Sequence, residues 1–196
     1  MKKVICVSGH AMNGKDTSAN YMRERLEARG DSVIIIHYAD LLKYICKQYF
    51  GWNGEKDEDG RQLLQYIGTD VVREKSPDYW MNFVASFLTL FEDEWDYAII
   101  PDARFPNEIG GLKEYGFDVF HVRVNREGFD SPLTYEQQHH QSEIALDYYP
   151  YDHLLINTTL GRLKDDVYKL CDFIAGMPQR DGLGGFEQIT FDDLDM

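Results

Sequence analysis

Residues 3–17 read KVICVSGHAMNGKDT, an apolar run followed by a loop between two glycines and a lysine. Its first six residues are mostly apolar and β-branched, which predicts a strand buried on both faces over 3–8. Gly9 and Gly14 enclose a short loop, and the residues after Lys15 take the apolar spacing of a helix. The glycines let backbone N–H groups surround a phosphate, and the lysine and the helix N-terminus add positive charge. The stretch therefore predicts a strand, a phosphate-binding loop and a helix in direct succession.

One position departs from the usual form of this motif. The Ser or Thr that normally follows the lysine and ligates Mg²⁺ is Asp16 here, and Thr17 stands one place later. We expect Asp16 to hold the metal through water and Thr17 to contact phosphate. The alternative is a plain glycine turn in which Asp16 caps the helix. The residues expected to bind the nucleotide phosphates are Gly9, Asn13, Gly14, Lys15, Asp16 and Thr17.

Strands alternate with helices along the rest of the chain. Apolar runs predict further strands over 33–38, 97–101, 117–124 and 153–157. Helical spacing predicts helices after Asp40 to about residue 49, and over 61–73, 78–91, 107–115 and 160–174, with a loop over 51–60. This alternation indicates an α/β domain with a mainly parallel sheet.

Composition limits the classes of function. The 196 residues include 20 Lys and Arg against 34 Asp and Glu, which gives a net charge of 20 − 34 = −14. Such a charge argues against a broad nucleic-acid-binding face, which needs many basic contacts to phosphate. The three cysteines are far apart and indicate free thiols in a reducing compartment. No apolar run approaches the length of a membrane-spanning helix, and we expect a cytoplasmic protein.

Four further segments carry chemistry-bearing residues. They read YADLLK over 38–43, RQLLQYIGTDVVR over 61–73, PDARFPNE over 101–108 and HQSE over 140–143. Together with the GHAMNGKDT loop, they resemble the bacteriophage deoxynucleoside monophosphate kinases, which belong to the P-loop nucleoside monophosphate kinase superfamily. The resemblance covers roughly residues 3–172.

This resemblance implies a fold and a reaction. The fold is a three-layer P-loop kinase domain over 1–176, with a five-stranded parallel sheet in the order 2-3-1-4-5. A helical acceptor-binding insertion over about 40–92 and a lid over about 125–142 belong to it. The reaction transfers the ATP γ-phosphate to a deoxynucleoside 5′-monophosphate with Mg²⁺, for phage DNA precursor synthesis in the host cytoplasm. A homodimer is also implied. The acidic tail, 177–196, has no counterpart, and docking or disorder are equally open for it.

The resemblance also assigns catalytic and donor-binding roles, which the chemistry of the residues supports. Lys15 would hold the terminal phosphates, and Asp102, at the end of a buried strand, would orient Mg²⁺ together with Asp16. Arg104 would grip the acceptor phosphate bidentately, and Arg126 would close over the phosphates from the lid. Asn157 stands where related kinases hold the adenine of ATP.

The expected acceptor site draws on the insertion and the turn after the third strand. Its residues are Asp40, Lys43, Arg61, Gln65, Arg73, Trp80 and Arg104. Purely structural roles remain possible for these residues. Asp40 and Asp102 could be helix caps, Arg104 a surface ion pair, and Lys43, Arg61, Gln65 and Arg73 solvated side chains. For Trp80, the core is the favoured place.

Two other functions remain possible at this point. One is a P-loop kinase with another acceptor, such as a modified base in DNA, phosphomevalonate or dephospho-coenzyme A. The net charge disfavours a DNA acceptor, and the protein is not expected to bind nucleic acid stably. The other is a non-catalytic nucleotide-binding module. The sequence does not decide which base is accepted.

Overall fold

Five parallel strands form one sheet in the order β2-β3-β1-β4-β5, as the resemblance predicts. The computed structural model describes residues 2–177, so the predicted tail lies almost wholly outside the described residues. The strands are β1 (Lys3–Ser8), β2 (Val33–Ile35), β3 (Tyr97–Ile100), β4 (Asp118–Arg126) and β5 (His153–Asn157). All four pairings are parallel.

The first strand lies at the centre of the sheet. Every residue of β1 is buried, and Ile5 pairs with Ile99 on one side and Phe120 on the other. This burial explains the unbroken apolar run, because a parallel strand covered on both faces has no polar side. The loop that follows Ser8 therefore begins at the end of a buried, central strand.

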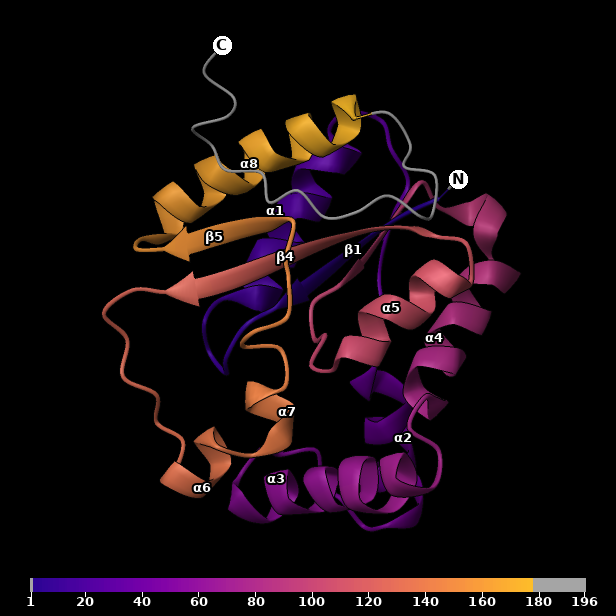
Figure 1. Cartoon of the computed structure of the whole chain (residues 1–196), viewed down its shortest axis with the longest axis vertical. Coiled ribbons are helices and arrows are strands. Elements are labelled where there is room, and N and C mark those ends of the chain that lie inside the picture. Colours follow the sequence, from indigo (N-terminus) through magenta and orange to yellow (C-terminus); the bar gives the residue numbers. More distant parts are fainter. Residues whose placement is uncertain (1, 178–196) are drawn as a thin grey trace.

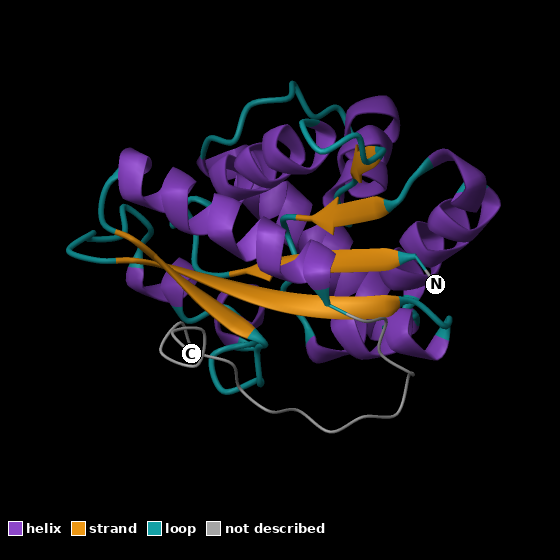
Figure 2. Ribbon diagram, turned by 90° about the horizontal axis from the view of Figure 1, so that it is seen from above, coloured by secondary structure: helices purple, strands orange, loops and turns teal. Residues whose placement is uncertain are grey.

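Helices cover both faces of the sheet, which gives three layers (Figure 2). On one face, α1 (Lys15–Glu27) and α8 (Leu160–Gly176) lie side by side and enclose an apolar core with Met22, Phe120 and Leu163. On the other face, α4 (Tyr79–Leu90) and α5 (Pro106–Glu114) enclose a second core with Trp80, Leu88 and Ile109.

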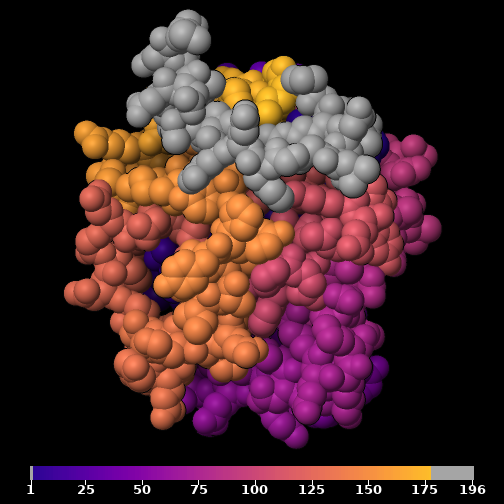
Figure 3. Space-filling model, in the orientation of Figure 1, coloured from indigo at the N-terminus to yellow at the C-terminus, as the bar shows by residue number. Residues whose placement is uncertain are grey.

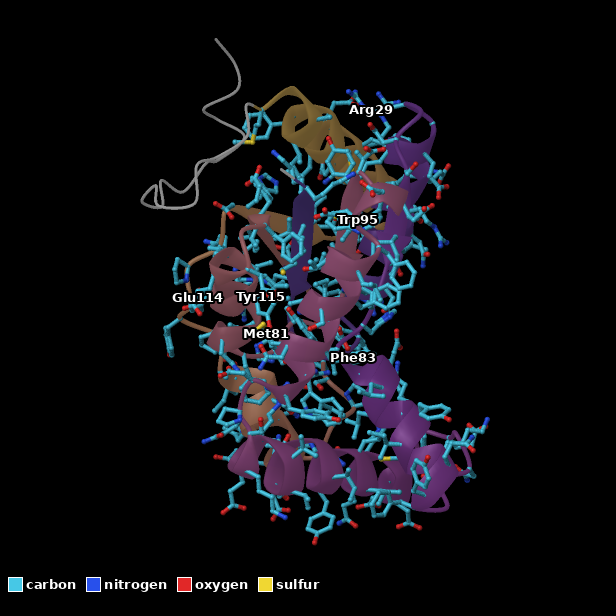
Figure 4. All side chains as sticks on the ribbon, turned by 90° about the vertical axis from the view of Figure 1, so that its right-hand side faces the viewer. Arg29, Met81, Phe83, Trp95, Glu114 and Tyr115 are labelled. Carbon is cyan, nitrogen blue, oxygen red and sulfur yellow. The ribbon has the colours of Figure 1, made fainter. Side chains whose placement is uncertain are left out.

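The contact between α4 and α5 depends on a glycine. Met81 lies on the α5 side of α4, whereas Phe83 lies on the opposite side and is partly exposed (Figure 4). A Cβ atom at Gly111 of α5 would come within 2.4 Å of the Met81 Cε atom. The two helices can approach this closely because position 111 carries no side chain.

The predicted insertion over about 40–92 contains α2 (Ala39–Tyr49), α3 (Glu58–Gln65) and a π-helix, η1 (Tyr66–Arg73), followed by α4. The first three of these elements lie beyond one end of the sheet (Figure 1). The predicted loop over 51–60 is too long, because the Asp57 carboxylate accepts the N–H of Gly60 at 2.8 Å and starts α3 at Glu58. The predicted single helix over 61–73 changes to a π-helix at Tyr66.

Other boundaries also differ from the prediction. The short β2 ends at Ile35, and the chain bends into α2, which begins at Ala39. Asp40 is therefore not the N-cap that the sequence suggests; its carboxylate accepts the backbone N–H of His37 at 3.1 Å. The strand β4 extends to Arg126, so the first residues of the predicted lid over about 125–142 belong to a strand. A three-residue 3₁₀ turn, Glu92–Glu94, precedes β3.

Two short helices, α6 (Tyr135–Gln138) and α7 (Gln141–Ile144), follow the segment after β4. They approach the insertion from the side opposite α2 (Figure 1). Thr134 caps α6 with its hydroxyl, which accepts the N–H of Gln137 at 3.2 Å, and His140 caps α7. The three cysteines are free and buried, as expected from their spacing.

Candidate active site

The loop between β1 and α1 requires both of its glycines. Gly9 has φ +140°, and a Cβ atom there would lie 2.3 Å from the Val124 carbonyl oxygen. Gly14 has φ +105°, and its Cβ would lie 2.7 Å from the Asn157 side chain. Only glycine takes such a backbone at such close approach without strain. The two positions therefore fix a loop that curls at the N-terminus of α1.

Asparagine side chains hold this loop to the neighbouring strands. Asn13 is buried, and its amide donates to the Val124 carbonyl at 3.3 Å. Asn157, the last residue of β5, donates to the Asn13 carbonyl at 3.0 Å. Both amides thus order the loop backbone, and the role of Asn157 at the adenine of ATP stays a prediction.

Lys15 is the cation of the loop. Its ammonium group donates to the carbonyl oxygens of Gly9 at 2.8 Å and His10 at 2.9 Å. Burial, followed by the positive charge of Arg104, lowers the pKa of Lys15 to about 8. A cation that is dehydrated and repelled by a second cation gains strongly when a phosphate arrives.

The two residues after Lys15 lie at the start of α1. The Asp16 side chain is 79% exposed and accepts a hydrogen bond from His37 at 3.3 Å, which lowers its pKa. Thr17 is half-buried. Within residues 2–177, no three His, Cys, Asp or Glu side chains gather in the way of a protein-only metal site.

A pocket of about 210 Å³ lies between the insertion, the turn after β3 and the lid. Polar and charged side chains from all three parts line it beside apolar ones. Those predicted from the sequence are Lys43, Arg61, Gln65, Arg73, Trp80, Asp102 and Arg104. Seven residues predicted from separate segments of the sequence thus line one pocket, although they are a minority of its lining residues.

Arg104 stands at the meeting point of the turn and α7. Its Nη1 atom donates to the Ser142 carbonyl at 2.8 Å and forms an ion pair with the Glu143 carboxylate. The side chain is about one-third exposed. Arg104 is therefore half-buried in the pocket wall instead of being a surface ion pair.

Arg73 is held by Glu108, a buried acid of α5. The two side chains form an ion pair, and the Arg73 guanidinium lies 4.1 Å from the centre of the Phe105 ring. The other Glu108 oxygen accepts the backbone N–H groups of Arg104 at 2.6 Å and Phe105 at 3.0 Å. The Glu108 carboxylate thus holds Arg73 through the Arg73 side chain and holds Arg104 through the Arg104 backbone N–H.

Asp102 connects the sheet to the insertion. Its two carboxylate oxygens accept the N–H groups of Tyr38 at 2.9 Å and Ala39 at 3.0 Å. It therefore binds the first N–H groups at the start of α2, which lies far away in sequence, and not the helix after its own turn. Asp102 also lines the pocket, so the same carboxylate shapes its floor.

The remaining acceptor candidates divide into two groups. Lys43, Arg61 and Gln65 line the pocket; Lys43 also pairs with Asp40 at 3.2 Å. Asp40 itself lies beside the pocket and not in its wall. Trp80 is 2% exposed, and its indole N–H donates to the Gly68 carbonyl at 3.0 Å, so it is a core residue with one edge in the pocket wall.

Arg126 contacts the phosphate loop. It ends β4, donates to the Met12 carbonyl at 3.3 Å and lies 4.2 Å from the centre of the Phe129 ring. In the space-filling view, indigo atoms of the N-terminal part of the chain lie at the bottom of a hollow between the segment after β4 and the segment after α7 (Figure 3). Arg123, three residues before the end of β4, forms a structural ion pair with Asp147 at 2.6 Å.

The pocket and the phosphate loop adjoin each other. Glu143 lines the pocket, contacts Arg104 and accepts the backbone N–H of Ala11 in the loop at 2.9 Å. A family model described as deoxynucleotide monophosphate kinase matches residues 32–167. The chain belongs to the deoxynucleotide monophosphate kinase family. The resemblance inferred from the sequence is thereby confirmed, and the protein is a nucleotide kinase.

Viral relatives support this assignment of the kinase. A protein of Acanthamoeba polyphaga mimivirus described as a candidate deoxynucleotide monophosphate kinase is 27% identical over 79% of this chain and 88% of its own length. The deoxynucleoside-5′-monophosphate kinase of Escherichia phage T5 is 31% identical over 60% of this chain and 51% of its own. The deoxynucleotide monophosphate kinase of Enterobacteria phage T4 is 34% identical over 38% of this chain and 32% of its own length.

Solved structures agree with the fold of the kinase. A sugar kinase from Janibacter sp. superimposes with a TM-score of 0.51 and 15% identity over 88% of this chain and 95% of that chain. The APS kinase CysC of Mycobacterium tuberculosis superimposes with a TM-score of 0.50 and 12% identity, over 87% of this chain and 97% of that chain. At this identity the likeness shows the P-loop kinase fold alone.

The sequence prediction missed two carboxylates of the kinase, Glu108 and Glu143. Both stand in quoted motifs, PDARFPNE and HQSE, but acids are not expected in a site for anions. A signal was available for Glu108, because an acid three residues after the start of a turn that leads into a Pro-initiated helix is typical of a capping box. The sequence offers no comparable signal for Glu143.

Proposed function

We propose that this kinase transfers the terminal phosphoryl group of ATP to the 5′-phosphate of a deoxynucleoside monophosphate, giving the diphosphate and ADP. The observation that carries the proposal is the Glu143 contact to both Ala11 and Arg104, because it sets the phosphate loop directly beside the pocket. Phosphoryl transfer needs this juxtaposition of donor and acceptor more than it needs covalent help from the protein.

The donor side consists of the phosphate loop and α1. Loop N–H groups and Lys15 bind the β- and γ-phosphates, with the loop shape set by Gly9 and Gly14. The Lys15 ammonium exchanges its two carbonyl partners for phosphate oxygens. Arg126, which lies over Met12, neutralises charge on the transferred group from the lid side. Asn13 and Asn157 support this arrangement by holding the loop backbone.

The acceptor side is the pocket. Arg104 binds the acceptor phosphate, with Lys43, Arg61 and Arg73 supplying further positive charge around it. Gln65 is a polar side chain of the insertion that can hydrogen-bond the base edge, and Trp80 forms part of the apolar wall. A dry, closed pocket also keeps water from taking the phosphoryl group.

The residues at the loop fit a Mg²⁺ ion that arrives with the nucleotide. Mg²⁺ in such sites keeps several waters and uses one or two carboxylates with substrate phosphates. Asp16 suits this role because its carboxylate is exposed beside Lys15, and Asp102 contributes as an outer partner through its pocket-facing position. The ion would screen the charge of the phosphates between donor and acceptor. Thr17 contacts phosphate next to Asp16.

A turnover screen tests the proposal. We expect ATP- and Mg²⁺-dependent ADP release with at least one of dAMP, dGMP, dCMP, dTMP, dUMP or hydroxymethylated pyrimidine nucleotides, measured by a coupled assay beside the ribonucleotides. Lys15→Ala must abolish the signal, which excludes a contaminating kinase. ATP binding without turnover of any of these acceptors would overturn the proposal.

The proposal also covers the kind of acceptor, the compartment and the oligomeric state. The net charge of −14 favours a free nucleotide of the cytoplasm over a DNA acceptor, because a polymer would need a broad basic groove. Within residues 2–177, no helix has the length and apolar character to cross a membrane. The homodimer stays a prediction, which light scattering of the purified protein tests.

A further inference from the structure

Glu143 is a nearly buried acid in a site that must hold two polyanions. Its side chain is 7% exposed, and it lies on α7, next to the phosphate loop and in the pocket wall. A carboxylate in such a place repels phosphates unless it is itself neutralised. Its partners therefore decide what it does.

Both oxygens of the carboxylate are engaged. Oε2 accepts the backbone N–H of Ala11 at 2.9 Å, and Oε1 pairs with Nη1 of Arg104. The carbonyl of Ser142 accepts a second hydrogen bond from the same Nη1 at 2.8 Å. One short helix therefore holds the loop backbone and one end of the Arg104 guanidinium.

This arrangement leaves the rest of the guanidinium for a ligand. Both contacts use Nη1, and the Nε and Nη2 atoms make no hydrogen bond within the part of the chain that the structure describes. These two nitrogens form the edge with which arginine binds two oxygens of one phosphate. Glu143 thus fixes the orientation of Arg104 without occupying its bidentate edge.

Glu143 also acts electrostatically on two cations, Lys15 and Arg104. The charge of Arg104 lowers the pKa of Lys15, and the charge of Glu143 raises it. Lys15 and Arg104 serve phosphates that must come together during the reaction, so their mutual repulsion is unavoidable. A carboxylate in contact with Arg104 offsets part of that repulsion.

We propose that Glu143 is a positioning residue for acceptor binding: it holds the Arg104 guanidinium beside the phosphate loop so that its free edge receives the acceptor phosphate. This inference rests on the proposed function, because it takes the pocket as the acceptor site. The competing role is a latch, in which the carboxylate occupies the place of the acceptor phosphate and must leave before it binds.

A double-mutant cycle tests the positioning role. Calorimetry measures the Kd of dAMP, dGMP, dCMP and dTMP separately for the wild type, Glu143→Gln, Arg104→Ala and the double variant. We expect Glu143→Gln to weaken binding of the preferred nucleotide about tenfold or more, the scale of one charge-assisted hydrogen bond. On the Arg104→Ala background, the same substitution should change Kd by less than about twofold, because it acts through Arg104.

Two further variants separate positioning from folding and from net charge. Glu136→Gln removes the same charge from an exposed residue of α6 and should leave binding unchanged. Glu143→Asp keeps the charge but is one methylene shorter, so it cannot reach both partners. We expect it to weaken binding when Arg104 is present and not when Arg104 is absent. Thermal unfolding shows that each variant is folded.

Each outcome decides the question. Additive effects of Glu143→Gln and Arg104→Ala overturn the positioning role, and tighter binding by Glu143→Gln overturns it in favour of the latch. Wild-type protein that binds a nucleotide but does not phosphorylate it overturns the proposed function alone. Wild-type protein that binds none of these four nucleotides, nor dUMP, nor a hydroxymethylated pyrimidine nucleotide overturns both.

Discussion

The side-chain amide of Asn157 donates a hydrogen bond of 3.0 Å to the backbone carbonyl of Asn13, so the last residue of β5 fixes the phosphate loop that follows β1. The two residues are 144 positions apart in sequence, and both are buried. The loop is therefore a property of the assembled sheet and not of its local sequence alone.

Replacing Asn157 by Asp removes the donor while keeping the size of the side chain. We expect Asn157→Asp to lower the free energy of unfolding by about 1–3 kcal/mol, because a buried carbonyl loses its partner and faces a carboxylate. ATP affinity should fall as well. Urea unfolding and calorimetry measure the two effects. The matched control is Asn125→Asp, an exposed position of β4, which should change stability by less than about 0.5 kcal/mol.

Much of the fold follows from local sequence, because buried parallel strands and amphipathic helices have patterns that survive any tertiary context. The apolar run before Gly9 and the glycines of the loop are such patterns. The predicted ends of helices and strands are wrong where a side chain distant in sequence stabilises a different end. The Asp102 carboxylate binds the N–H groups of Tyr38 and Ala39, and so α2 begins one residue before Asp40.

The cations of the site could be predicted, since Lys15, Arg73 and Arg104 stand in motifs that suit phosphate chemistry. The carboxylates that pair with Arg73 and Arg104 could not be predicted. Glu108 meets Arg73 across 35 positions and Glu143 meets Arg104 across 39, and no spacing rule relates such distant residues. The same limit applies to the hydrogen bond between Asn157 and Asn13, which joins residues 144 positions apart.

The phosphate loop should not tolerate a side chain at Gly9. A Cβ there would lie 2.3 Å from the Val124 carbonyl oxygen, which belongs to the rigid strand β4. We expect Gly9→Ala to unfold the loop locally, to abolish ATP binding and to lower Tm by several degrees. Gly30→Ala is the control, because Gly30 also has positive φ but has no atom within 4 Å of the added Cβ. It should keep ATP binding and cost only about 1 kcal/mol in backbone strain. Equal losses in both variants would refute the steric account.

Breaking the buried ion pair between Arg73 and Glu108 should affect both stability and acceptor binding. We expect Glu108→Gln to lower the free energy of unfolding by about 3–5 kcal/mol, because it leaves the Arg73 charge without its partner in a mostly buried place. The KM for the deoxynucleotide should rise more than the KM for ATP. The control is Glu114→Gln, on the exposed side of the same helix (Figure 4). A normal acceptor KM in folded Glu108→Gln would show that Glu108 serves the fold alone.

The low pKa of Lys15 should set the upper pH limit of the reaction. Burial and the charge of Arg104 lower this pKa from 10.5 to about 8, so the free enzyme loses the ammonium charge as the pH rises through 8. Only the protonated form neutralises the donor phosphates. We therefore expect kcat/KM for ATP, which reports ionisations of the free enzyme, to be constant below this pH and to fall about tenfold per pH unit above it. Arg104→Gln should move the bend to higher pH, because it removes the second cation while the burial of Lys15 remains. Lys15→Arg should remove the bend between pH 7 and 10, whatever its absolute rate, because a guanidinium stays protonated there. A bend that persists in Lys15→Arg would assign the ionisation to another group.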